Sequence, residues 1–144
     1  MGNGDCEAIQ QELMDFALGF PEAWVDYPWG DEPVVKVRKK IFAFLGEFRG
    51  GCGALGVKLP ESGEVMLLEP WAKPSSHGLG RSGWVTMQFE RVEDVPLGLL
   101  FELIEESYVA IAPKKLVAMA LGGDGRGKQG KVRGPQDASQ RSVR

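Results

Sequence analysis

The chain has 144 residues and a mass of 15.7 kDa, the size of one domain, and 43% of its residues are hydrophobic, enough for a core. Two cysteines are too few for a disulfide scaffold, one histidine excludes a multi-histidine metal site, and no apolar run is long enough to span a membrane. The N-terminus carries acidic residues and lacks the apolar stretch of a secretory signal, so we expect a cytoplasmic protein.

The first half of the chain predicts a helix followed by short strands. Asp5 suits the N-cap of a helix over residues 5–19, and Pro21 prevents its continuation. Its apolar residues recur at helical spacing: Ile9, Leu13, Phe16, Ala17 and Phe20. Short turns then separate the expected strands Trp24–Tyr27, Val34–Val37, Ile41–Leu45 and Ala54–Leu59.

The second half predicts one clear strand and two helices. Glu64–Leu68 fits either a short strand or a helical turn, and Pro70–Gly83 is expected to be irregular. In Trp84–Glu90, apolar and polar residues alternate, which is typical of a half-buried strand. A helix is expected from Pro96 to Ile111, and a shorter one begins at Pro113. This order favours an α+β fold, an antiparallel sheet with helices packed on one face.

Charge divides the chain into an acidic body and a basic tail. Residues 122–144 carry six basic and two acidic side chains, and residues 1–121 carry 11 basic and 18 acidic ones. The tail contains no aromatic residue, leucine, isoleucine or methionine, so it cannot bury enough apolar surface to offset its ordering entropy. We expect a domain over residues 1–121 and a disordered tail over 122–144.

Catalytic signatures are missing from the sequence. Neither GxxxxGK[ST] nor GxSxG occurs, His77 has no evident carboxylate partner, and Cys52 lies in a glycine-rich loop. The acidic residues near the N-terminus fit an ordinary solvated helix face better than a metal site. We therefore expect no enzymatic activity, no cofactor and no metal.

The densest basic cluster of the body lies on the predicted hairpin. Counted at alternating strand positions, Lys36, Arg38 and Lys40 would reach the same face and could contact phosphates. Against this stand the acidic body and the ordinary use of lysine to keep strand edges soluble.

Five segments, taken in order, resemble a known family. They are Pro-Trp-Gly-Asp-Glu at 28–32, Val-Val-Lys-Val-Arg-Lys-Lys-Ile-Phe-Ala at 34–43, Gly-Arg-Ser-Gly-Trp-Val-Thr at 80–86, and Glu-Leu-Ile-Glu-Glu-Ser-Tyr at 102–108 with Pro-Lys-Lys-Leu at 113–116. In this order and spacing the chain resembles the MmcQ/YjbR family over about residues 5–119. These are small proteins described as DNA-binding, with a CyaY-like fold of the double-wing type.

The resemblance implies the function that we expect first. It implies DNA binding by a basic hairpin and patch, with Arg81, Lys114 and Lys115 joining Lys36, Arg38 and Lys40. Fold and family do not by themselves define a site.

A second hypothesis is a small-molecule or protein-binding module. The tryptophans Trp29 and Trp84 could form the apolar wall of a pocket beside the sheet, with His77 nearby and Arg81 pairing an anionic group. The oligomeric state and the identity of any ligand do not follow from the sequence.

Overall fold

The computed structural model describes residues 3–30, 32–46, 53–76 and 78–121. Contacts divide the chain into two compact units, with the boundary between Ile111 and Ala112. The described part of the second unit contains helix α4 (Lys114–Ala120), on which Lys114 and Lys115 are exposed. The expected tail 122–144 lies outside the described residues, so the division into a 1–121 domain and a tail stays a prediction.

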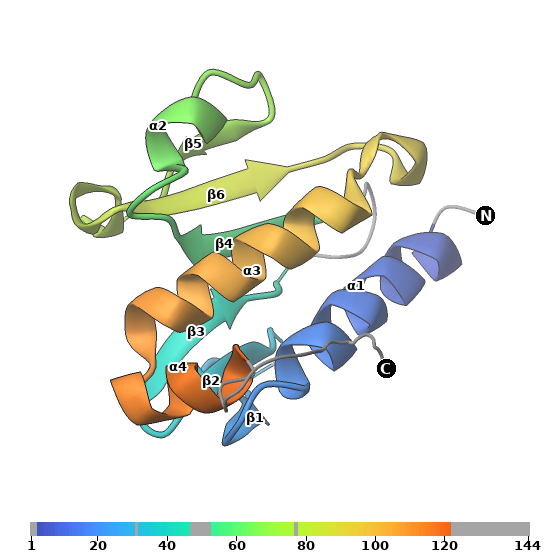
Figure 1. Cartoon of the computed structure of the whole chain (residues 1–144). Coiled ribbons are helices and arrows are strands. Elements are labelled where there is room, and N and C mark those ends of the chain that lie inside the picture. Colours follow the sequence, from blue (N-terminus) through green and yellow to red (C-terminus); the bar gives the residue numbers. More distant parts are fainter. Residues whose placement is uncertain (1–2, 31, 47–52, 77, 122–144) are drawn as a thin grey trace. The chain divides into compact units, whose positions relative to one another are not determined.

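The first unit is an antiparallel sheet with helices on one face, which confirms the predicted α+β class (Figure 1). The strands are ordered β1-β2-β3-β4-β6-β5, and α3 packs on β3 and β4 beside α1. The elements of this unit are α1 (Asn3–Leu18), β1 (Ala23–Asp26), β2 (Val34–Val37), β3 (Lys40–Phe44), β4 (Ala54–Lys58), α2 (Gly63–Met66), β5 (Ala72–Pro74), η1 (Leu79–Ser82), β6 (Trp84–Gln88), η2 (Val92–Asp94) and α3 (Leu97–Ile111).

The core lies between the sheet and the helices α1 and α3. Its centre is aromatic: the Tyr108 ring stacks on Phe20 with 4.5 Å between centroids and meets Phe42 edge-on at 5.1 Å. The Phe16 ring of α1 stacks on Phe101 of α3 at 4.6 Å. These pairs join both helices to β3, so the helix-covered face of the sheet carries most of the apolar burial.

Polar side chains of α3 are tied to the sheet and to neighbouring loops. The Ser107 hydroxyl donates to the Phe42 carbonyl at 2.6 Å and accepts from the Lys58 amide at 2.9 Å, so it joins β3 to β4. The Tyr108 hydroxyl donates to the Pro21 carbonyl at 2.8 Å, and burial raises the pKa of this phenol. Each of these buried polar groups therefore has a hydrogen-bond partner in the protein, as is usual for polar atoms that water does not reach.

A β-bulge sets which side chains of β3 enter the core. Val35 pairs with Ala43 and Lys36 pairs with Ile41, so Phe42 is an extra residue in the ladder. Phe42 and Ala43 are both fully buried. Because of this extra residue, the next side chain, that of Phe44, lies on the opposite face from the core.

The segment expected to be irregular, Pro70–Gly83, contains two short elements. The edge strand β5 pairs with β6, and the single turn η1 follows it, so the prediction was wrong here. Gly80 allows η1 to approach β5 closely, because a Cβ at this position would lie 2.8 Å from the Pro74 Cβ. Within Glu64–Leu68, of the two alternatives, the chain forms the helical turn α2.

Candidate ligand-binding groove

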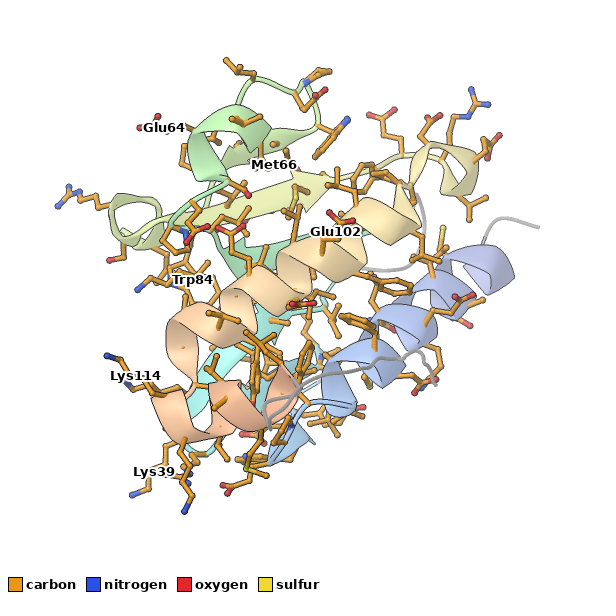
Figure 2. All side chains as sticks on the ribbon, in the orientation of Figure 1. Lys39, Glu64, Met66, Trp84, Glu102 and Lys114 are labelled. Atoms are coloured by element: carbon orange, nitrogen blue, oxygen red, sulfur yellow. The ribbon has the colours of Figure 1, made fainter. Side chains whose placement is uncertain are left out.

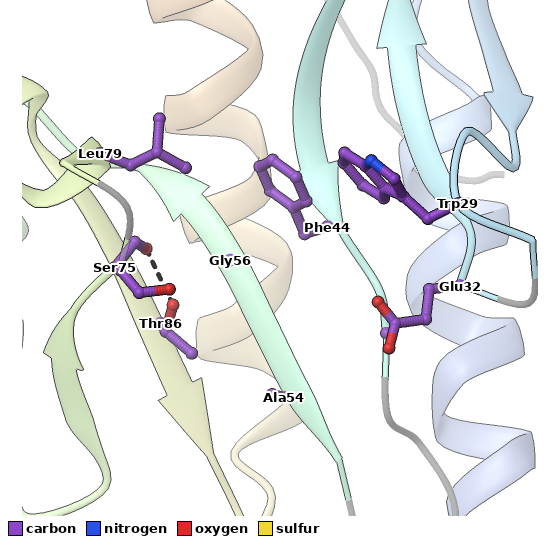
Figure 3. A pocket seen from close by; sticks show the side chains of 10 residues that line it. Trp29, Glu32, Phe44, Ala54, Gly56, Ser75, Leu79 and Thr86 are labelled. Atoms are coloured by element: carbon purple, nitrogen blue, oxygen red, sulfur yellow. Dashed lines mark hydrogen bonds between the residues drawn. The ribbon is translucent and has the colours of Figure 1, made fainter.

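The sheet face opposite α1 and α3 carries a groove of about 500 Å³. Figure 3 views this face, with the helices behind the strands. The floor comes from β3, β4 and β6, and the rims come from the connections before β2 and after β5. The described lining residues are Trp29, Glu32, Phe44, Gly46, Ala54, Gly56, Ser75, Ser76, Leu79 and Thr86.

One wall of the groove is aromatic. Trp29 is 63% exposed, and its ring lies nearly parallel to that of Phe44, with 6.1 Å between centroids and 13° between planes. The Trp84 ring meets Phe44 edge-on, with 5.3 Å between centroids. Phe44 therefore contacts two indoles, of which Trp29 is exposed and Trp84 is buried.

Small residues keep the floor of the groove shallow and open. Gly56 lies opposite both Phe44 and Thr86 in the ladder, and it is buried. A Cβ at this position would lie 3.3 Å from the Phe44 Cβ, closer than comfortable packing allows. Glycine at this position therefore lets the Phe44 ring lie across the sheet and leaves space beside it.

Two kinds of polar group face the groove. The hydroxyls of Ser75 and Thr86 are hydrogen-bonded to each other at 2.8 Å (Figure 3). The half-buried Glu32 side chain packs against Gly46, where a Cβ would lie 3.0 Å from its Cδ. Within the described part of the chain, no hydrogen bond or ion pair joins the Glu32 carboxylate to another residue. This carboxylate lines the groove.

The residues of the hypothesised pocket lie in different places. Trp29 lines the groove, and Trp84 is only 8% exposed and contacts the Phe44 ring edge-on. Arg81 is exposed on η1 and is not among the described lining residues, and His77 lies outside the described residues. The sequence hypothesis did not include four residues that line the groove: Glu32, Phe44, Ser75 and Thr86. Of these, Thr86 had a signal in the sequence, because it is a polar residue of the alternating pattern in Trp84–Glu90.

The basic residues of the hairpin are separated by the turn. Lys36 shares a face with Ile41, Lys40 shares the opposite face with Val37, and Arg38 lies in the turn with a positive φ of 57°. The expectation that these three cations point the same way was therefore wrong. The alternation of a strand does not continue through the turn that contains Arg38.

Two of these three cations are paired with carboxylates. The Lys36 Nζ lies 2.8 Å from Asp26 and 5.1 Å from the centroid of the Trp24 ring. The hydrogen bond from Lys36 holds the pKa of Asp26 below its ordinary value. Arg38 Nε lies 2.9 Å from Glu22, which raises the pKa of its guanidinium. Much of the positive charge on the hairpin is therefore neutralised locally.

Other cations have no acidic partner within the described residues. The exposed ones are Lys39, Lys40, Lys73, Arg81, Lys114 and Lys115, and Figure 2 shows Lys39 directed away from the ribbon. No helix in the described part of the chain is long and apolar enough to cross a membrane. Across the same residues, no three His, Cys, Asp or Glu side chains are grouped so that they could hold a metal ion.

Fold and groove define a small α+β protein whose antiparallel sheet is covered by helices on one face and hollowed on the other. The YjbR family model matches residues 18–110, and the chain belongs to this family, which confirms the resemblance. The crystal structure of Deinococcus radiodurans protein DR2400, described by the DUF419 family model, is similar with a TM-score of 0.58 and 25% identity, covering 73% of this chain and 79% of that one. No curated protein matches the chain.

Proposed function

We propose that this YjbR-family chain is a binding module whose ligand site is the groove on the open face of its sheet. The observation that carries the proposal is Trp29, a residue that is 63% exposed although its ring stacks against Phe44 at the edge of the groove. Exposed aromatic surface at a concave site is typical of ligand recognition.

Size and chemistry of the groove support the same proposal. Its volume of about 500 Å³ falls within the range of roughly 300–1,000 Å³ that is usual for small-molecule sites. The apolar wall and floor would supply binding energy, while Glu32, Ser75 and Thr86 would fix the orientation of the ligand. We propose non-covalent binding and no enzymatic reaction.

The test follows the NMR signal of the Trp29 indole N–H during titration with a panel of metabolites. The variant Trp29→Phe assigns that signal among the four tryptophans of the chain. Trp24 serves as an internal reference, because its indole N–H donates to the Arg38 carbonyl at 2.8 Å. We expect a saturable shift at Trp29 with a constant signal at Trp24. A panel that leaves Trp29 unchanged would contradict the proposal.

DNA binding is the second candidate function, and we propose a cytoplasmic location for the protein. DNA binding is favoured by the exposed cations Lys39, Lys40 and Arg81, and weakened by the pairing of Lys36 and Arg38 with acids. Because phosphate contacts release counterions, DNA affinity should fall steeply as salt is raised. We expect the double variant Lys39→Glu and Lys40→Glu to reduce that dependence. Oligonucleotide binding that is absent, or insensitive to salt, would rule this candidate out.

A further inference from the structure

We propose that the groove receives a planar cation of the guanidinium or amidinium class, held by the Glu32 carboxylate beside the Trp29 ring. This inference rests on the proposed function of the groove and names the chemistry of its ligand. Figure 3 shows the two side chains on the same rim, both directed toward the hollow.

Charge is the first argument. Of the described residues that line the groove, Glu32 is acidic and none is basic. A neutral apolar ligand would desolvate this carboxylate without replacing its hydrogen bonds to water, which is costly. An anionic ligand would be repelled by it. A cation compensates the charge and replaces the lost hydrogen bonds.

Shape is the second argument. The floor is a flat stretch of sheet at Gly56 and Ala54, and the wall is the indole of Trp29 with Phe44 beside it. A guanidinium or amidinium group is planar, stacks on aromatic rings, and presents two parallel N–H donors that match the two oxygens of a carboxylate. A compact ammonium ion makes neither the stacked nor the bidentate contact.

The hydroxyl pair across the groove fits the same ligand. Ser75 and Thr86 share one hydrogen bond, so one hydroxyl proton is used between them and lone pairs remain free to accept. A nitrogen-rich planar cation carries more N–H donors than one carboxylate can accept. The remaining donors would point toward these hydroxyl oxygens.

The experiment compares matched probes by calorimetry and by the Trp29 indole signal. Arginine amide and benzamidine carry the planar cation. Citrulline amide differs from arginine amide in having a neutral side chain, lysine amide has a compact cation in its side chain, and all three amides share the same α-amino group. We expect the two planar cations to bind at least about tenfold more tightly than citrulline amide or lysine amide, because hydrogen bonds to a charged partner are strong.

Variants locate the interaction. Glu32→Gln keeps the size of the side chain and should weaken arginine amide binding at least about tenfold. Glu64→Gln on α2 removes an exposed carboxylate that does not line the groove, and it should change affinity less than about twofold. An unchanged Trp24 signal in Glu32→Gln shows that the fold is retained.

Outcomes separate this inference from the proposed function. Equal binding of citrulline amide, equal binding of lysine amide, or unchanged affinity in Glu32→Gln would each overturn the guanidinium assignment. So would guanosine binding at Trp29 without arginine amide binding, since the base of guanosine is planar and neutral. In that last case the groove is still a ligand site. If no probe or metabolite moves the Trp29 signal, both proposals fall together.

Discussion

The two faces of the same sheet have opposite character. On the helix-covered face, Phe42, Leu55 and Met87 are fully buried, and Ser107 joins two strands from α3. On the open face, the same strands present Phe44, Gly56 and Thr86 around a hollow. Strand alternation thus gives each strand one side that stabilises the fold and one side that is free to bind. The predictions below test this separation.

The largest difference is expected between neighbouring residues of β6. Met87→Ala removes a fully buried side chain and should lower the free energy of unfolding by about 2–5 kcal/mol. Thr86→Ala, on the open face, loses the hydrogen bond to Ser75 and should cost about 1 kcal/mol. Urea denaturation of both variants measures the two values. Equal losses would contradict the separation of the faces.

The polar link beneath the helices should also be costly to remove. Ser107→Ala leaves the Lys58 amide and the Phe42 carbonyl without their partner, and we expect a loss of about 1–3 kcal/mol in unfolding free energy. Ser62→Ala is the control, because the Ser62 side chain makes no capping hydrogen bond to α2. A loss no larger than in the control would show that Ser107 contributes little.

Filling the floor should weaken binding as well as stability. Gly56→Val places a Cβ 3.3 Å from the Phe44 Cβ, and this overpacking should lower the free energy of unfolding by about 1–3 kcal/mol. Ligand affinity at Trp29 should fall at least about tenfold, because the added atoms occupy the site. Gly98→Ala is the control, since a Cβ there meets no atom within 4 Å. Retained affinity in Gly56→Val would place the ligand elsewhere.

The smallest effect concerns pH. Lys36 holds the pKa of Asp26 in the folded protein below the ordinary value of 3.8, so this pair stabilises the fold above that value. The stabilisation is lost as the pH falls through the lowered pKa. Unfolding measured between about pH 5 and about pH 2 should therefore show a shallower decline for Asp26→Asn than for the natural chain. Parallel curves would contradict the pairing.

The spacing of apolar residues along the chain predicted those helices and strands that have one clearly apolar and one clearly polar face. Helix α3 and strand β6 carry regular patterns, and their positions were confirmed within a few residues. Strand β5 was missed because its three residues have little local preference for a strand and include Pro74. Its conformation depends on pairing with β6, which no local pattern reports.

The site was harder to predict than the fold, for two physical reasons. The bulge at Phe42 changes the face of every later residue in β3, and it has no signature in the sequence, so Phe44 could not be assigned to the groove. The pairs of Lys36 with Asp26 and Arg38 with Glu22 depend on the register of β1 against β2. A count of charges along the sequence therefore overestimates the number of hairpin cations that are free to bind phosphate.

The rims of the groove belong to connections, whereas its floor belongs to strands. Trp29 and Glu32 precede β2, and the segment between β5 and β6 contains Ser75, Ser76 and Leu79. Connections accept substitutions, insertions and deletions more readily than the strands they join. Homologues built on this scaffold can therefore diverge in what they recognise by exchanging two short segments, while their shared helical layer evolves under the separate constraint of folding.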